Sequence, residues 1–206
     1  MTDNRTVEEY LAQLASDAPT PGGGSVAGLV AALAAGLGSM VCMLTKEPAN
    51  REASAALAKA TTELAAARTA ALAFSHDDEQ AYAAYIAATH LPKATREDKA
   101  VRREAVQAAL RSAAEVPLQL AVHCAGLLAS LRPVVVHGNP HLRSDTRIAV
   151  MLAETAHRAA LVNVRVNLAL MKDADLAEQL ETTAQASERQ RDSSVAELER
   201  LLETRS

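Results

Sequence analysis

A short acidic and aromatic stretch, SHDDEQAY at residues 75–82, holds the side chains best suited to proton transfer. Asp78 and Tyr82 stand four residues apart, so on a helix they share one face. A carboxylate that faces a pocket from an Ala-rich helix has its pKa shifted by burial towards use as an acid or base. The alternative is that Asp77 and Asp78 are ordinary solvated charges, and the stretch alone does not decide between these interpretations.

Three consecutive glycines, Gly22, Gly23 and Gly24, stand directly before the most apolar run of the chain. A helix that begins near Ser25 adds unpaired N–H donors and partial positive charge at this point. A carboxylate, a phosphate or a polarised carbonyl could bind there. The alternative is that the glycines only let a loop pass close to a packed helix. The letters fit a dinucleotide fingerprint, but no strand precedes them, and no Lys follows as in a P-loop.

Two asparagines, Asn163 and Asn167, lie four residues apart in the otherwise apolar stretch NVRVN. Asn is a poor helix former, so the pair indicates either polar recognition or hydrogen bonds between helices. In GNPHLRSD, Asn139 lies in a turn, and Ser144 and Asp145 stand at the start of the next helix, where capping alone explains both. His137 and His141 flank this turn, but no third metal ligand stands near them in the sequence, so we predict no metal site.

The elements that must position these residues are helical. Ala, Leu, Glu and Arg favour helix, β-branched residues occur only in short runs, and Trp is absent. We expect a single all-α domain over residues 1–206, a multihelical bundle with a buried central helix of small residues. The expected helices cover residues 6–16, 25–45, 50–89, 96–136 and 144–172, with a last helix from 173 onward.

Details of three helices are also predicted. The first helix has Val7, Leu11 and Leu14 on one face. Thr95 caps the fourth helix, and Pro117 kinks or splits it. The last helix, with dense charges between its apolar positions, is expected to form a solvated lid or a dimer arm.

Charge and composition exclude several classes of function. The net charge is −4 and no basic patch is present, which argues against a nucleic-acid partner. Residues 26–44 are long enough to span a membrane, but they are mostly small and lack aromatic anchors, so we expect a buried helix and no membrane partner. The polar N-terminus does not resemble a signal peptide, and Cys42 and Cys124 fit reduced thiols in a cytoplasmic protein. An Ala-rich core is thin, which predicts a homodimer.

Five segments stand in order over residues 5–175: APTPGGGS, DDEQAY followed by LPKAT, AAEVPLQLA, GNPHLRSD and AALVNVRVNL. Their order and spacing resemble the cyclodeaminase/cyclohydrolase family, which comprises the C-terminal half of formiminotransferase-cyclodeaminase and stand-alone methenyltetrahydrofolate cyclohydrolases. The resemblance implies a helical bundle that acts on the one-carbon unit of tetrahydrofolate, with Asp78 as the catalytic residue. It implies a substrate site formed by Pro21, Gly22, Gly23, Gly24, Ser25, Tyr82, Asn139, Ser144, Asp145, Asn163 and Asn167.

The reaction we expect is hydrolysis of 5,10-methenyltetrahydrofolate to 10-formyltetrahydrofolate, with no metal and no cofactor beyond the folate substrate. Asp78 would attract the cationic ring, accept a proton from water and return it to the leaving nitrogen. Two alternatives stay open: a formiminotetrahydrofolate cyclodeaminase, which releases ammonia, and a non-catalytic folate-binding helical module. After LTK the sequence departs from the family, which leaves Lys46 and Arg51 as the few candidates for holding a polyglutamate tail.

Overall fold

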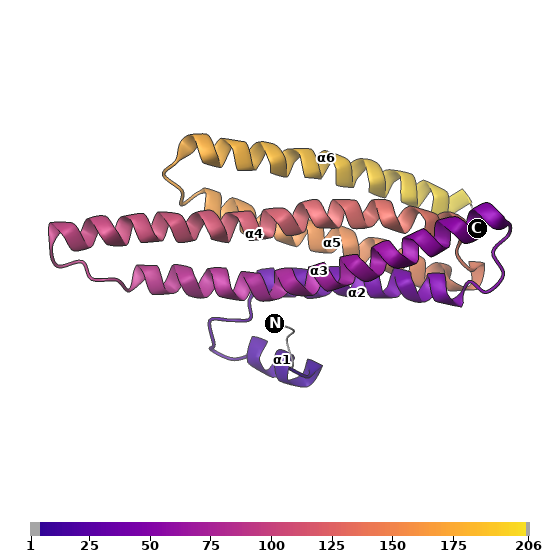
Figure 1. Ribbon diagram of the computed structural model, residues 1–206, viewed down its shortest axis with the longest axis horizontal. Helices are drawn as coiled ribbons and strands as arrows, with labels where there is room; N and C mark the ends of the chain where they lie inside the picture. Colours follow the sequence, from indigo (N-terminus) through magenta and orange to yellow (C-terminus); the bar gives the residue numbers. More distant parts are fainter. Residues whose placement is uncertain (1–4, 205–206) are drawn as a thin grey trace.

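The chain is an all-α bundle, which confirms the predicted fold class (Figure 1). The computed structural model describes residues 5–204, and these form six α-helices and one short 3-10 helix, with no strand among them. The helices are α1 (Val7–Leu14), α2 (Gly23–Leu44), α3 (Arg51–Thr89), α4 (Arg96–His137), α5 (Arg143–Leu168) and α6 (Ala174–Thr204), and η1 (Pro140–Leu142) is the 3-10 helix.

The four central helices, α2 to α5, pack side by side, and α6 lies along α4 and α5 (Figure 1). α3 and α4 continue past the N-terminus of α2, so they project as a pair at the end where they are joined. α6 is not a separate solvated lid, so this part of the prediction for the last helix is wrong. It is part of the bundle, because it buries Ala184, Ser187, Arg191, Leu198 and Leu202.

Several helices begin at side chains that cap the backbone. Thr6 and Glu9 form a capping box at α1, and the predicted cap Thr95 forms another with Asp98 at α4. The Asn50 side chain accepts a backbone hydrogen bond of 2.8 Å at the start of α3. These local signals explain why the beginnings of α3 and α4 agree with the sequence prediction.

The start of α5 differs from the prediction. η1 leads into α5 without a gap, so the helix begins at Arg143, and Ser144 does not cap it. α5 ends at Leu168, before the expected limit at residue 172. Asp173 then accepts a hydrogen bond of 3.0 Å from the Leu176 N–H and starts α6, as the sequence predicts.

α4 continues through Pro117 and Pro133 without interruption. Of the two expected outcomes at Pro117, a kink or a split, the split is therefore wrong, although a proline inside a helix costs about 3 kcal/mol. Packing offsets this cost, because Pro117 and its neighbours Leu118 and Leu120 are buried in the bundle. α4 can thus support the other helices over its whole length.

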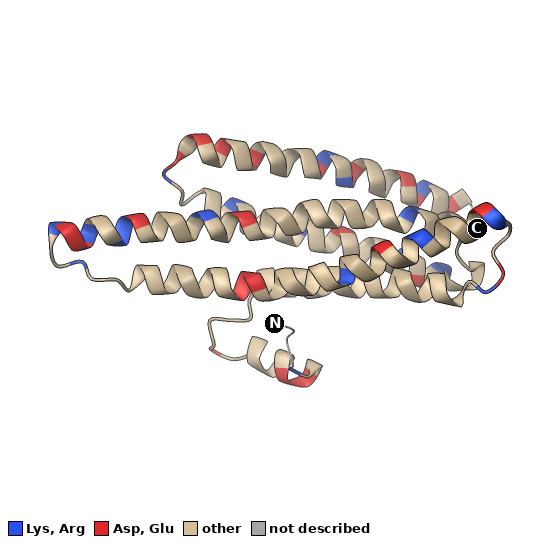
Figure 2. Cartoon of the chain, viewed as in Figure 1, with Lys and Arg blue, Asp and Glu red and all other residues tan. Residues whose placement is uncertain are grey.

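α2 carries no charged residue (Figure 2). It buries one face that is made mostly of small side chains. Its opposite face exposes Leu33, Met40 and Met43, whose exposed fractions are 55%, 37% and 61%. α2 and the apolar part of α4 are long and apolar enough to cross a membrane, and half of each such segment is buried in the bundle. α2 is therefore a core helix on one side and an apolar surface on the other, rather than buried all round.

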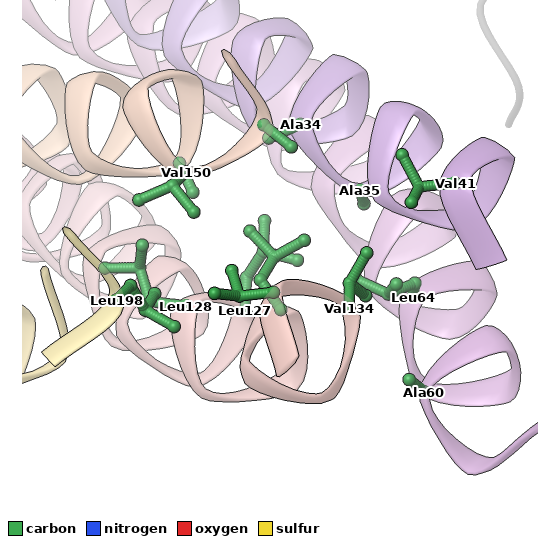
Figure 3. Packing of buried hydrophobic residues seen from close by; sticks show 14 of the residues in the cluster. Ala34, Ala35, Val41, Ala60, Leu64, Leu127, Leu128, Val134, Val150 and Leu198 are labelled. Carbon is green, nitrogen blue, oxygen red and sulfur yellow. The ribbon is translucent and has the colours of Figure 1, made fainter. Parts of the chain in front are cut away.

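The core changes in character along α2. Large side chains fill the end near the C-terminus of α2, where Leu64, Leu127, Leu128 and Leu198 pack together (Figure 3). Around the first half of α2 the core consists mainly of alanines from α2, α3, α4 and α5. Small side chains let the backbones approach each other closely at this end, which is where the glycine motif lies.

Both cysteines lie inside the bundle. Cys42 and Cys124 are buried free thiols, and burial raises the pKa of Cys124 to about 12.

α1 buries Tyr10, whereas Val7 and Leu11 are 74% and 54% exposed. The apolar face of α1 thus points outward, because the Tyr10 hydroxyl hydrogen-bonds with Ser25 of α2 and fixes the rotation of α1.

Candidate functional site

A cavity of about 340 Å³ lies beside the N-terminus of α2, where α2, α3, α4 and α5 meet. Pockets for small ligands have volumes of about 300–1,000 Å³. The wall combines one carboxylate, two phenols, two carboxamides and glycine backbone with several apolar side chains. The lining residues are Pro19, Thr20, Gly22, Gly23, Gly24, Asp78, Ala81, Tyr82, Tyr85, Ala113, Asn163, Val166, Asn167 and Leu170.

α2 and α3 approach each other closely through two glycines of α2. A Cβ atom on Gly28 would lie 2.7 Å from the backbone nitrogen of Ser75, which is nearer than real Cβ contacts. One turn earlier in α2, a Cβ atom on Gly24 would overlap the carboxylate of Asp78. Because the two helices run antiparallel, the contact between Gly28 and Ser75 brings Asp78 against Gly24. The absence of side chains at these glycines is what allows the carboxylate to reach α2.

Asp78 packs against the first turn of α2, where the backbone N–H of Ser25 lowers the pKa of its carboxyl group. Gly22, at the N-cap position of α2, has no side chain to accept a hydrogen bond, and the Asp78 carboxylate approaches this turn from the neighbouring helix. Burial raises the pKa of Asp78 above its ordinary value, the charge on Glu79 raises it further, and the Ser25 N–H opposes both effects. A carboxyl group of raised pKa on a cavity wall can accept a proton and return it.

Asn163 and Asn167 line the α5 side of the cavity. A Cβ atom on Gly23 would lie 4.0 Å from Nδ2 and Oδ1 of Asn163. Asn167 Nδ2 donates to the carbonyl of Ala113 at 2.7 Å and to that of Asn163 at 2.9 Å. This uses both amide hydrogens, so Oδ1 is the group that Asn167 can offer to a ligand. Asn167 therefore forms a hydrogen bond between α5 and α4, and because both side chains line the cavity, recognition of a ligand by the pair stays a prediction.

The acidic and aromatic stretch divides between the cavity and solvent. Asp78 and Tyr82 share one face of α3, as their spacing predicts, and line the cavity together with Tyr85. Tyr82 remains 41% exposed. Asp77 is exposed and does not line the cavity. Asp77 is therefore an ordinary solvated charge, whereas Asp78 faces the cavity.

Pro21 and Ser25 are buried and do not line the cavity, although both are predicted as site residues. Pro21 follows a cis peptide bond, between two residues that do line the cavity, Thr20 and Gly22. The Ser25 hydroxyl turns away from the cavity towards Tyr10 and Ser75. Ser25 reaches the site through its backbone N–H alone.

Asn139, Ser144 and Asp145 lie at the opposite end of the bundle, and in a single chain they do not reach the cavity. The Asn139 N–H donates to Thr45 Oγ1 at 2.9 Å, and Thr45 follows the last residue of α2. α2 has 22 residues and is about 33 Å long, so this turn is a whole helix away from Gly24. Within one chain α4 runs past the cavity and places the turn at the far end, so the structure does not bring these three residues to this cavity. Asn139 caps η1 there, with a hydrogen bond of 3.0 Å from the His141 N–H, and Ser144 is exposed.

A group of polar residues behind Asp78 is not predicted from the sequence. Glu79 Oε1 accepts hydrogen bonds from Arg5 at 2.7 Å and from the Ser25 hydroxyl at 2.9 Å. Ser25 Oγ also lies 2.8 Å from Ser75 Oγ. A serine in each of two apolar helices, with a glutamate four residues after the second, is the signal that could have indicated this network.

Known proteins resemble this chain over most of its length. The sequence profile of the formiminotransferase-cyclodeaminase family matches residues 6–186. A methenyltetrahydrofolate cyclohydrolase from Methylorubrum extorquens is 37% identical over 180 residues, which cover 87% of this chain and 86% of that protein. The formimidoyltransferase-cyclodeaminase of Sus scrofa is 35% identical over 166 residues, which cover 80% of this chain and 31% of that protein. The crystal structure of a formiminotetrahydrofolate cyclodeaminase from Thermotoga maritima matches with a TM-score of 0.87 and 25% identity, covering 98% of this chain and 97% of that chain.

Proposed function

The chain belongs to the formiminotransferase-cyclodeaminase family, and we propose that it hydrolyses 5,10-methenyltetrahydrofolate to 10-formyltetrahydrofolate. The position of Asp78 carries the proposal, because it is a carboxylate on the wall of a cavity whose other polar groups are uncharged. The 37% identity to a methenyltetrahydrofolate cyclohydrolase extends over 86% of that protein and supports this reaction within the family.

The first step is attack by water on the methenyl carbon. This carbon lies in a cationic amidinium between N5 and N10, so it is already electrophilic, and a carboxylate at the cavity wall attracts the cation. As the new C–O bond forms, Asp78 accepts a proton from the water, and the adduct becomes a neutral carbinolamine. Asp78 is then a carboxylic acid, a form that its raised pKa favours.

The second step breaks the bond between the carbon and N5. Asp78 donates its proton to N5 as this bond breaks, and the carbinol O–H loses its proton to water. The formyl group stays on N10, and Asp78 returns to its ionised form. The whole reaction consumes one water molecule and releases one proton, and a single carboxylate serves both steps.

Uncharged groups hold the ring system in this proposal. Asn167 Oδ1 accepts a hydrogen bond from the pterin edge, since both of its amide hydrogens are used within the protein. Gly23 has no side chain and keeps the space in front of Asn163 open. The two tyrosines and Val166 supply the apolar and aromatic surface of the site.

A cyclodeaminase is the second candidate function. It is favoured by the TM-score of 0.87 to a formiminotetrahydrofolate cyclodeaminase, which covers 98% of this chain. In that reaction N10 attacks the carbon of the protonated formimino group, so the bond between N10 and this carbon forms and the bond from the carbon to the formimino nitrogen breaks. The same carboxylate would take the proton from N10 and give it to the formimino nitrogen, which leaves as ammonia and yields the methenyl cation.

One experiment on the purified protein separates these activities. Loss of methenyl absorbance, without ammonia release from the 5-formimino compound, supports the proposal. Ammonia release without methenyl hydrolysis would replace it with the cyclodeaminase. Equal folate binding by the wild type and Asp78→Asn, with turnover by neither, would identify a non-catalytic folate-binding module.

We further propose that the enzyme is a cytoplasmic homodimer. Its buried free thiols support a reducing compartment. Exposed apolar side chains of α2 and α3 line one shallow groove, and contiguous apolar surface of this kind is typical of subunit interfaces. The groove is lined by Leu29, Ala32, Leu33, Gly36, Leu37, Met40, Arg68, Leu72 and Leu152.

A further inference from the structure

Two consecutive carboxylates, Asp78 and Glu79, both lie at the start of α2 but meet Ser25 in different ways. Asp78 lines the cavity and packs against Gly24, and the Ser25 backbone N–H lowers the pKa of Asp78. The Ser25 hydroxyl donates to Glu79 Oε1 at 2.9 Å, and Glu79 does not line the cavity. A single residue at the start of α2 therefore links the cavity carboxylate to a second one behind it.

The direction of the hydrogen bonds around Ser25 follows from its single hydroxyl hydrogen. This hydrogen goes to Glu79, which as a carboxylate can only accept. Tyr10 and Ser75 lie 3.1 Å and 2.8 Å from Ser25 Oγ, so both must donate to it. Three hydroxyl groups from α1, α2 and α3 are thus ordered towards the Glu79 carboxylate.

Arg5 completes this arrangement from the segment before α1. Its guanidinium forms an ion pair of 2.7 Å with Glu79, and both side chains are mostly buried, at 23% and 15% exposure. It also donates to Gln13 at 2.9 Å and lies 5.1 Å from the centre of the Tyr10 ring. Gln13 in turn donates to the Thr20 carbonyl at 3.0 Å, and Thr20 lines the cavity. α1 is therefore tied both to Glu79 and to the cavity edge.

We propose that Arg5 is a positioning residue for Asp78. By pairing with Glu79 it holds that carboxylate away from the cavity and balances its charge, so that Asp78 is the carboxyl group that exchanges a proton with the substrate. The inference rests on the proposed function for this proton exchange. The pairing itself rests on the contacts of Arg5, Ser25 and Glu79.

Few other charges lie near Asp78. Among the described residues, the titratable side chains of the cavity wall other than Asp78 are Tyr82 and Tyr85, both from α3. α2, α4 and α5 place no charged side chain on this wall. Asp77 is exposed, so solvent and salt screen its charge. The charge of Glu79 acts on Asp78 and raises its pKa. Arg5 forms an ion pair with Glu79 and carries the opposite charge. Removing either charge should therefore change the titration of Asp78.

The test follows the titration of the Asp78 carboxyl carbon by ¹³C NMR, with Asp78→Asn used for assignment. Arg5→Gln should raise the midpoint by about 0.5–1 pH unit, because Glu79 is then unbalanced. Glu79→Gln should lower it by a similar amount, and the double variant should return it close to the wild-type value. The acid limb of the pH profile of kcat/KM should move in the same directions.

Two controls separate this role from general stability. Arg5→Lys keeps the positive charge, so Asp78 in this variant should titrate with a midpoint close to that of the wild type. Arg132→Gln removes another Arg–Glu pair, of 2.6 Å, between α4 and α6, and should leave the titration midpoint of Asp78 unchanged.

If Arg5→Gln does not fold, the titration of Asp78 in Glu79→Gln tests the proposal, because the amide oxygen of the substituted side chain can still accept the hydrogen bond from the Ser25 hydroxyl. An unchanged Asp78 midpoint in Glu79→Gln would overturn the proposal. If the wild type shows neither activity, the proposed function fails, and the titration still decides the role of Arg5.

Discussion

Asp78 occupies the space that a side chain on Gly24 would need. The position of the carboxylate is thus set by the backbone of α2, against which it packs directly. The Ser25 N–H then holds its orientation. A general base must stay within hydrogen-bond reach of the proton that it abstracts, and this contact between two long helices provides a fixed position. The glycines therefore serve the geometry of the carboxylate as well as exposing backbone.

Asp78→Asn tests the catalytic role. We expect kcat to fall by about 10²–10⁴-fold, the usual contribution of a general acid–base group. The fold should survive, because the Asn carbonyl oxygen can still accept the Ser25 N–H. Methenyl absorbance measures turnover, and circular dichroism measures the melting temperature. Asp77→Asn is the matched control: it removes the same charge from an exposed neighbour and should keep wild-type activity. Wild-type turnover by Asp78→Asn would exclude this residue from catalysis.

Gly24→Ala tests whether the glycine is required by Asp78. The added methyl group would overlap the carboxylate, so α2 or Asp78 must move. We expect a loss of activity and a destabilisation of about 1–3 kcal/mol, as for other overpacked sites. Denaturant unfolding measures the stability, and the two assays of folate turnover measure activity.

The neighbouring glycine provides the control for that experiment. A Cβ atom on Gly23 would lie 4.0 Å from Asn163, which is ordinary contact, so Gly23→Ala should fold with wild-type stability. If Gly24→Ala and Gly23→Ala behave alike in stability and activity, the close contact with Asp78 has no special importance.

The fold could be predicted where local signals are strong. α3 was expected over residues 50–89 and covers Arg51–Thr89, because Asn50 caps its start and the break at residues 90–92 ends it. The exposed face of α2 could not be predicted, since the helix is apolar on every side and no periodicity marks its surface. The rotation of α1 depends on the hydrogen bond between Tyr10 and Ser25, a tertiary contact that no local pattern contains.

The candidate site could be predicted only in part. Helical spacing placed Asp78 and Tyr82 on one face, and the structure brings both to the cavity with Gly22, Gly23 and Gly24. Motif order, in contrast, says nothing about which end of a bundle a turn occupies. Asn139 therefore could not be located until the length of α4 and its contact with Thr45 were known.

Leu33→Glu tests the proposed dimer. Leu33 is 55% exposed in the apolar groove, so a charge there should separate the subunits while leaving each bundle folded. Light scattering coupled to gel filtration should report a dimer for the wild type and a monomer for the variant. Val101→Glu is the control, because Val101 is 60% exposed on α4 outside the groove, and it should leave the dimer intact. A wild-type protein that elutes as a monomer would contradict the proposal.

His157 makes the stability of the bundle depend on pH. Its side chain is completely buried between α5 and α6, with Nε2 3.2 Å from Ser187 Oγ and Nδ1 3.4 Å from Arg191. Burial and the charge of Arg191 lower the pKa of His157 to about 4, and the charge of Glu188 opposes them. In the unfolded chain the pKa of a histidine is about 6.5.

As the pH falls, the unfolded chain therefore takes up a proton at this residue before the folded chain does. The stability that His157 contributes is complete above about pH 6.5 and is lost as the pH falls towards 4. A shift of this size corresponds to a loss of at most about 3 kcal/mol. Denaturant unfolding of the wild type and His157→Gln at pH 7 and pH 4.5 measures it, because other titrating groups cancel in the difference between the two proteins. The wild type should lose more stability than the variant over this range. Equal losses would mean that His157 is protonated in the folded bundle, and that its contact with Arg191 does not keep it neutral.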